Sequence, residues 1–101
     1  MKTAIFFWLV TWPLYVSAAD DEVRQSIIDR CRDQMGEYGA SMVKFCVDED
    51  LAAYSALQGY DDRYTPIIDR CTRQILSIGG WSMVRFCADE DIEAERALED
   101  Y

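Results

Sequence analysis

The chain contains one sequence unit twice, and this repeat limits the folds that it can adopt. The segment 27–31, with the sequence IIDRC, returns at 67–71, an offset of 40 residues. The segment 41–46, SMVKFC, returns as SMVRFC at 82–87, an offset of 41 after one inserted residue. Both copies close on an Ala-Leu-x-x-Tyr segment. One structural unit therefore accounts for most of the chain.

Each unit has the hydrophobic spacing of a helix–turn–helix hairpin. Val23, Ile27, Cys31 and Met35 recur every four residues, which predicts an amphipathic helix from residue 20 onward. Two glycines within 36–39 break it, and Ser41 is expected to cap a second helix that runs to about residue 58. A third helix is expected to start at 65–66 and to end at the glycines 79–80, and a fourth to run from about residue 82 to 98. No segment alternates with a period of two, so the predicted fold is all-α, with two antiparallel hairpins.

Four cysteines allow three disulfide connectivities. The repeat, and the similar distance of each cysteine from its turn, predict the pairs Cys31–Cys46 and Cys71–Cys87, one staple in each hairpin. A redox site is disfavoured because no Cys-x-x-Cys is present. A zinc site is disfavoured because its ligands are usually closely spaced pairs.

Residues 1–19 have the composition of a signal peptide that is removed on export. Lys2 precedes a nearly unbroken apolar run over 4–16, and Ser-Ala-Ala at 17–19 favours cleavage after Ala19, with Ala18 as the alternative. A retained membrane anchor is disfavoured, because the run is shorter than the ~20 residues that cross a bilayer and contains Pro13. We therefore expect one mature domain, 20–101, with repeat 1 at about 23–60 and repeat 2 at about 64–101.

Acidic side chains dominate the expected mature domain. Without Lys2, nine basic and nineteen acidic residues remain, which is a net charge of −10. Such a charge repels nucleic acid and anionic membranes and favours a basic protein as the partner. The chain has no His, the commonest catalytic base and metal ligand. We therefore expect no metal, no cofactor and no enzymatic activity.

Two acidic triplets follow the second cysteine of each unit and are the best candidates for ligand chemistry. They are Asp48-Glu49-Asp50 and Asp89-Glu90-Asp91. Consecutive helical residues point about 100° apart, so a triplet does not converge on one ion by itself. Neither copy has the spacing of a calcium-binding EF-hand loop. The favoured interpretation is a solvated helix face, partly paired with Arg30 and Arg70 across the hairpin.

Aromatic residues in the two turns are the candidates for binding another protein. Trp81 occupies the inserted position beside two glycines, and Tyr38 lies in the other turn. An exposed Trp on a rigid loop is a common binding anchor, although covering the open end of a hairpin is the favoured role for both residues. Four further apolar residues have core-like helical spacing and are expected in the core: Met42, Phe45, Met83 and Phe86.

The cysteine unit resembles a segment of small exported bacterial proteins. The resemblance lies in Cys-x14-Cys together with the sequence SMVKFCVDED, and it covers Cys31 to Asp50 and Cys71 to Asp91. It implies a location in the bacterial envelope and no particular activity. The twin-cysteine hairpins of mitochondrial intermembrane-space proteins are similar in architecture, but their cysteine spacing differs, so that analogy concerns the fold alone.

These observations predict a non-enzymatic exported protein of the periplasm or the extracellular space. We expect a disulfide-stapled protein-binding or structural module of the bacterial envelope. An acid-stress periplasmic chaperone is the first alternative, because acid would neutralise nineteen carboxylates, reverse the net charge and loosen the hairpin pair. An inhibitor of a basic enzyme, such as a cell-wall hydrolase, is the second alternative, and only the negative charge favours it.

Overall fold

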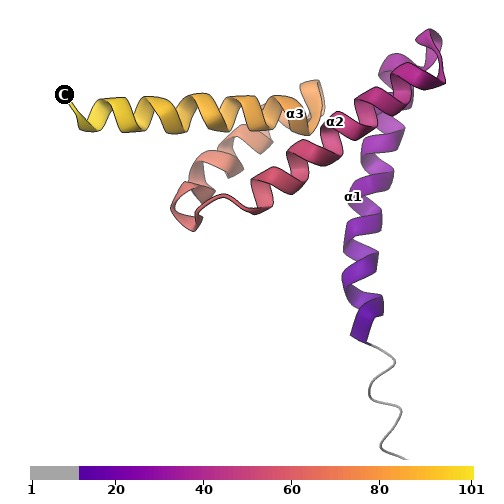
Figure 1. The fold of residues 1–101 in the computed structure, drawn as a ribbon, viewed down its shortest axis with the longest axis horizontal. Coiled ribbons are helices and arrows are strands. Elements are labelled where there is room, and N and C mark those ends of the chain that lie inside the picture. The colour runs from indigo at the N-terminus through magenta and orange to yellow at the C-terminus, as the bar shows by residue number, and fades with distance from the viewer. Residues whose placement is uncertain (1–11) are drawn as a thin grey trace, which may run out of the picture.

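The computed structural model describes residues 12–101, which form helices joined by short turns (Figure 1). Helix α1 spans Trp12–Met35, α2 spans Ala40–Gln58 and α3 spans Thr65–Glu99. Two short 3-10 helices, η2 (Gly36–Tyr38) and η3 (Asp62–Tyr64), lie in the connections. These residues contain no β-strand, which confirms the predicted all-α class. Residues 1–11 of the predicted signal peptide lie outside the described part of the chain.

Helix α3 is two helices that meet at Gly80. Gly80 has φ 76° and ψ −171°, a backbone conformation that interrupts the helix. Cys71 and Cys87 are joined, with their Cα atoms 5.9 Å apart, whereas 16 residues of continuous helix would span about 24 Å. The chain therefore reverses direction at Gly80, and the yellow C-terminal half of α3 runs back from the turn in Figure 1. We refer to α1 with α2 as hairpin 1, and to the two halves of α3 as hairpin 2.

Glycines with positive φ make both turns. Gly39 has φ 104° and ψ 164°, close to the conformation of Gly80, and it immediately precedes α2. Glycine adopts such angles without the steric cost that a Cβ atom brings. The prediction that Ser41 caps the second helix is wrong, because α2 already begins at Ala40. The backbone of Gly39, and not a serine side chain, sets the start of this helix.

One disulfide closes each hairpin, as the repeat predicted. Cys31 is bonded to Cys46, with the two Cα atoms 5.8 Å apart, and Cys71 is bonded to Cys87. Cys31 and Cys71 are completely buried. Each disulfide therefore lies in the interface between the two antiparallel helices of its hairpin and joins them there.

The main core lies where α2 meets hairpin 2. Leu57 of α2 packs with Cys71, Val84 and Ala88 of α3, and these four residues are buried. Partly buried hydrophobic side chains surround them: Tyr60, Ile67, Ile68, Ile75, Leu76, Trp81 and Cys87. Hairpin 2 is thus packed against hairpin 1 as well as stapled internally. None of the helices described between residues 12 and 101 is both long and apolar enough to cross a bilayer.

Four residues that we expected in the core are exposed instead. Met42 and Phe45 on α2 are 41% and 62% exposed, and their counterparts Met83 and Phe86 on α3 are 45% and 60% exposed. A hairpin of two helices buries only the stripe that each helix turns toward the other or toward the second hairpin. No third layer of helices within residues 12–101 covers the opposite stripe, so these side chains face solvent.

The disulfide of hairpin 2 should contribute about 3 kcal/mol to stability, because it closes a loop of 16 residues. The variant Cys71→Ala/Cys87→Ala should lose this amount from the free energy of unfolding, measured by urea titration with far-UV circular dichroism. Reductant should then destabilise the variant less than the native protein, since only Cys31–Cys46 remains to be reduced. Equal stability of the oxidised variant and the oxidised native protein would contradict the prediction.

Candidate functional site

A buried carboxylate joins the two hairpins. Asp50 of α2 has only 3% of its side chain exposed and forms an ion pair with Arg30 of α1. Its two oxygens also accept the backbone N–H groups of Trp81, at 3.0 Å, and Ser82, at 3.2 Å. These N–H groups belong to the first turn of the helix that follows Gly80, where no intrahelical partner exists. Asp50 therefore caps a helix of the other hairpin and lies at the positive end of its dipole.

Glycine at position 80 permits this close approach. A Cβ atom there would lie 2.1 Å from Nη2 of Arg30 and 2.6 Å from Oδ2 of Asp50. Gln34 of α1 makes a further contact, because its amide donates to the carbonyl of Ile78 at 3.5 Å. Three side chains of hairpin 1 thus hold residues 78–82 of hairpin 2. We call Arg30, Gln34 and Asp50 the body set of hairpin 1, and residues 78–82 the tip of hairpin 2.

The remaining members of the acidic triplets do not converge on a ligand site. Asp48, Glu49, Asp89 and Glu90 are exposed, as expected for a solvated face, whereas the burial of Asp50 departs from that expectation. Asp48 pairs with Lys44 at 2.8 Å on the same helix. Asp91 pairs with Arg70, and both side chains are about half exposed. Among the described residues, no cluster of three or more Cys, Asp or Glu is placed to hold a metal ion.

The two turn aromatics lie in different environments. Trp81 is half-buried, and its ring meets that of Tyr54 edge to face, with centroids 4.9 Å apart. Trp81 therefore packs at the junction of the hairpins. Tyr38 is exposed at the end of hairpin 1. Of the two candidates, Tyr38 is the one that offers its ring to solvent.

The largest apolar side chains that face solvent at equivalent places in both repeats are Phe45 and Phe86, each beside a methionine. We call Met42 with Phe45, and Met83 with Phe86, the outer Met–Phe pairs. Met42 and Phe45 border a hollow of about 290 Å³ that reaches Gly79 and Ser82 of hairpin 2. Helical spacing identified these residues as one apolar stripe, but it did not show that the stripe is uncovered.

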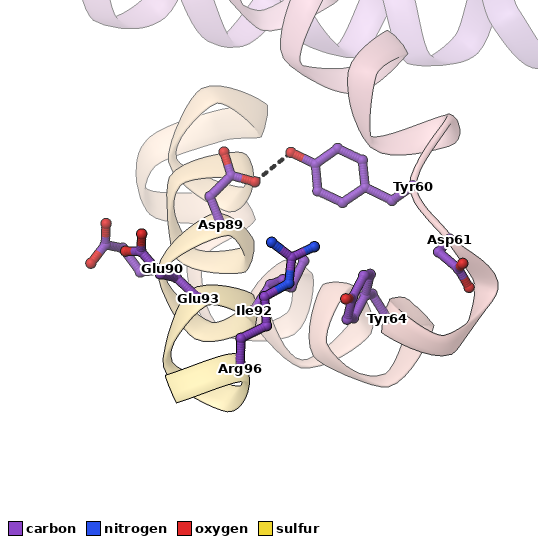
Figure 2. Close-up of a pocket in the computed structure, with 8 residues that line it drawn as sticks. All are labelled: Tyr60, Asp61, Tyr64, Asp89, Glu90, Ile92, Glu93 and Arg96. Atoms are coloured by element: carbon purple, nitrogen blue, oxygen red, sulfur yellow. Dashed lines mark hydrogen bonds between the residues drawn. The ribbon is translucent and has the colours of Figure 1, made fainter. Parts of the chain in front are cut away.

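A larger groove lies between the inter-hairpin connection and the last turns of α3 (Figure 2). It has a volume of about 550 Å³, and it is lined by Tyr60, Asp61, Tyr64, Asp89, Glu90, Ile92, Glu93 and Arg96. Figure 2 shows the Tyr60 hydroxyl directed to Asp89, to which it donates a hydrogen bond. Burial raises the pKa of Tyr60 above its usual value of 10.0, and the hydrogen bond to Asp89 raises this pKa further.

Comparisons with protein-family models, with curated proteins and with solved structures find no significant match to this chain.

Replacing Asp50 should cost far more stability than replacing its repeat counterpart, Asp91. Asp50→Asn leaves the partly buried Arg30 without its counter-charge and should lower the free energy of unfolding by about 2 kcal/mol or more. Asp91→Asn breaks a half-exposed pair and should cost less than about 1 kcal/mol. Urea unfolding of both variants tests the comparison. Equal losses would show that the buried cap contributes no more than the exposed ion pair.

Tyr60 should make stability fall with pH in alkaline solution. The pKa of Tyr60 is higher in the folded state, so the folded protein keeps a proton that the unfolded chain releases above about pH 10. The stabilisation is complete below that pH and is lost as the pH rises through the folded-state pKa. Between about pH 10 and 12 the unfolding free energy of the native protein should fall more steeply than that of Tyr60→Phe. Parallel curves for the native protein and Tyr60→Phe would contradict the prediction.

Proposed function

We propose that the protein is a non-enzymatic, exported protein-binding module of the bacterial envelope. The observation that carries this proposal is that the two outer Met–Phe pairs expose the same large apolar side chains in both repeats. Exposed apolar groups of this size on a rigid scaffold are typical of binding surfaces. Methionine beside phenylalanine also gives an adaptable contact, because the thioether side chain is flexible and polarizable.

Charge around these side chains indicates the chemistry of the partner. Phe45 is followed one helical turn later by Asp48 and Glu49, and Phe86 by Asp89 and Glu90, so each apolar contact has carboxylates beside it. All four carboxylate residues are exposed. The complementary surface is an apolar hollow bordered by Lys or Arg side chains. We therefore expect a basic protein as the partner, with Tyr38 as an additional contact at the end of hairpin 1.

The disulfides support the proposed location. Bonds of this kind persist in oxidising compartments such as the periplasm and the extracellular space. Export would use residues 1–19 as a cleaved signal peptide, which leaves residues 20–101 as the mature protein. The two disulfides would then persist in that compartment and keep the binding surface in shape.

Partner capture from an envelope extract tests this proposal. The chain is expressed with its own leader, purified in the oxidised form and used as bait, with mass spectrometry as the readout. Phe45→Ala/Phe86→Ala should reduce capture of a basic partner about tenfold or more, since exposed aromatic anchors often contribute above 1 kcal/mol each. Leu98→Ala is the matched control, because it removes another exposed apolar side chain outside the outer Met–Phe pairs.

The experiment is run near neutral pH and again in acid. One reproducible partner at neutral pH, lost in Phe45→Ala/Phe86→Ala and retained in Leu98→Ala, would support the proposal. Many unrelated clients captured only in acid would replace it with an acid-stress chaperone. A partner captured equally by both variants would show that the outer Met–Phe pairs do not form the binding surface.

A further inference from the structure

The contact between the hairpins uses one tip and one body set, although the repeat supplies two of each. The tip of hairpin 2 is held by the body set of hairpin 1. Each hairpin, however, has both a tip and a body set. Hairpin 1 therefore has a tip with no body set on it, and hairpin 2 has a body set with no tip on it.

The body set of hairpin 2 repeats that of hairpin 1 residue by residue. Arg70, Gln74 and Asp91 are the sequence counterparts of Arg30, Gln34 and Asp50. Arg70 and Asp91 already form the same ion pair, so the carboxylate is held as in hairpin 1. The two carboxylates differ in burial, because the side chain of Asp91 is 40% exposed and that of Asp50 is 3% exposed. Within residues 12–101 no backbone N–H group donates to Asp91.

The tip of hairpin 1, residues 37–41, has the shape that such a body set accepts. Gly39 has nearly the backbone conformation of Gly80, and Ala40 and Ser41 begin α2 as Trp81 and Ser82 begin the helix after Gly80. No side chain caps α2. A Cβ atom on Gly39 would meet nothing within 4 Å, whereas at Gly80 the same space is filled by Arg30 and Asp50. The body set of hairpin 1 fills the space beside Gly80 at the tip of hairpin 2, and the equivalent space beside Gly39 at the tip of hairpin 1 is open.

A second set of residues is likewise covered in the contact within the chain, whereas the counterparts of these residues in the other repeat are more exposed. Leu57 packs in the core at the hairpin junction and is 5% exposed, while its counterpart Leu98 is 60% exposed. Tyr60 donates to Asp89, and their counterparts are Tyr101, which is fully exposed, and Asp48. Val84 and Ala88 are completely buried beside Leu57, and their counterparts Val43 and Val47 on α2 are half-buried.

We propose that copies of this protein associate head to tail, with the body set of hairpin 2 in one copy binding the tip of hairpin 1 in the next. Asp91 would cap α2 of the next copy, and Leu98 would pack against Val43 and Val47 of that copy. The contact repeats the one already made within the chain, so a second copy is the occupant that fits both free surfaces. The two surfaces differ, so this association is heterologous and generates an open array or a closed ring.

Sedimentation velocity of the native oxidised protein, expressed with its own leader, tests the association. The average mass should rise with concentration between about 10 µM and 1 mM, as expected for a modest interface. Asp91→Arg places a second cation beside Arg70 and removes the cap, and Ala40→Pro removes the backbone N–H that Asp91 would accept, which is the counterpart of the Trp81 N–H. Asp91→Arg should raise the dissociation constant about 30-fold or more, and Ala40→Pro about tenfold or more. Leu98→Ala should weaken association as well.

Mixing the two variants distinguishes this geometry from a symmetric dimer. Asp91→Arg keeps an intact tip and Ala40→Pro keeps an intact body set, so an equimolar mixture should form a heterodimer that grows no further. Circular dichroism and thermal melting should show that both variants fold like the native protein. The proline introduced by Ala40→Pro suits the first position of a helix, and Gly39 before it already has an extended ψ of 164°.

Three results would overturn the proposal: a native protein that stays monomeric throughout, association unchanged in both variants, or no heterodimer on mixing. This association does not depend on the basic partner proposed above. Phe45→Ala/Phe86→Ala should self-associate like the native protein, because Phe45 and Phe86 are 62% and 60% exposed although both lie beside the contact within the chain. Loss of partner capture and loss of self-association would therefore appear in different variants.

Discussion

The Asp50 carboxylate is the interaction on which the arrangement of the two hairpins depends. Each hairpin is closed by its own disulfide, but no covalent bond other than the short connection after α2 places one against the other. Asp50 receives one guanidinium from its own hairpin and two backbone N–H groups from the other. A buried carboxylate without such donors would carry a large desolvation cost. The hairpins are therefore favoured in the one orientation that brings the turn at Gly80 to Asp50.

The repeat places nearly identical sequences in two different environments. Arg30 with Asp50 and Arg70 with Asp91 are equivalent pairs, yet only the first is covered by a helix N-terminus. Gly39 and Gly80 make equivalent turns, yet only Gly80 has another side chain against it. In a two-repeat chain each repeat can contact only one neighbour, so one surface of each kind is left over. This is the general situation of repeat proteins, whose end units need a cap or a further unit.

The thinness of the molecule explains its exposed apolar residues. Two packed helix pairs bury a core of small and medium side chains around Leu57, Cys71 and Val84, and the disulfides supply stability that so small a core provides only in part. The outer Met–Phe pairs lie on the faces that remain. They lie beside the tips and body sets, but they stay exposed where the contact within the chain is made, so a basic partner and a second copy would contact different side chains.

The sequence by itself determined the all-α class, the two hairpins, the turn positions and the disulfide pairing. These features follow from helical periodicity, glycine positions and the equal spacing of cysteines, all of which are local or are repeated within one unit. Tertiary structure alone decided that Asp50 is buried and Asp91 is not, that Trp81 packs on Tyr54, and that Phe45 faces solvent. The physical reason is that periodicity shows which side of a helix is apolar or charged, whereas burial depends on what lies against that side. That neighbour comes from a distant part of the chain, and two equivalent positions acquire different neighbours.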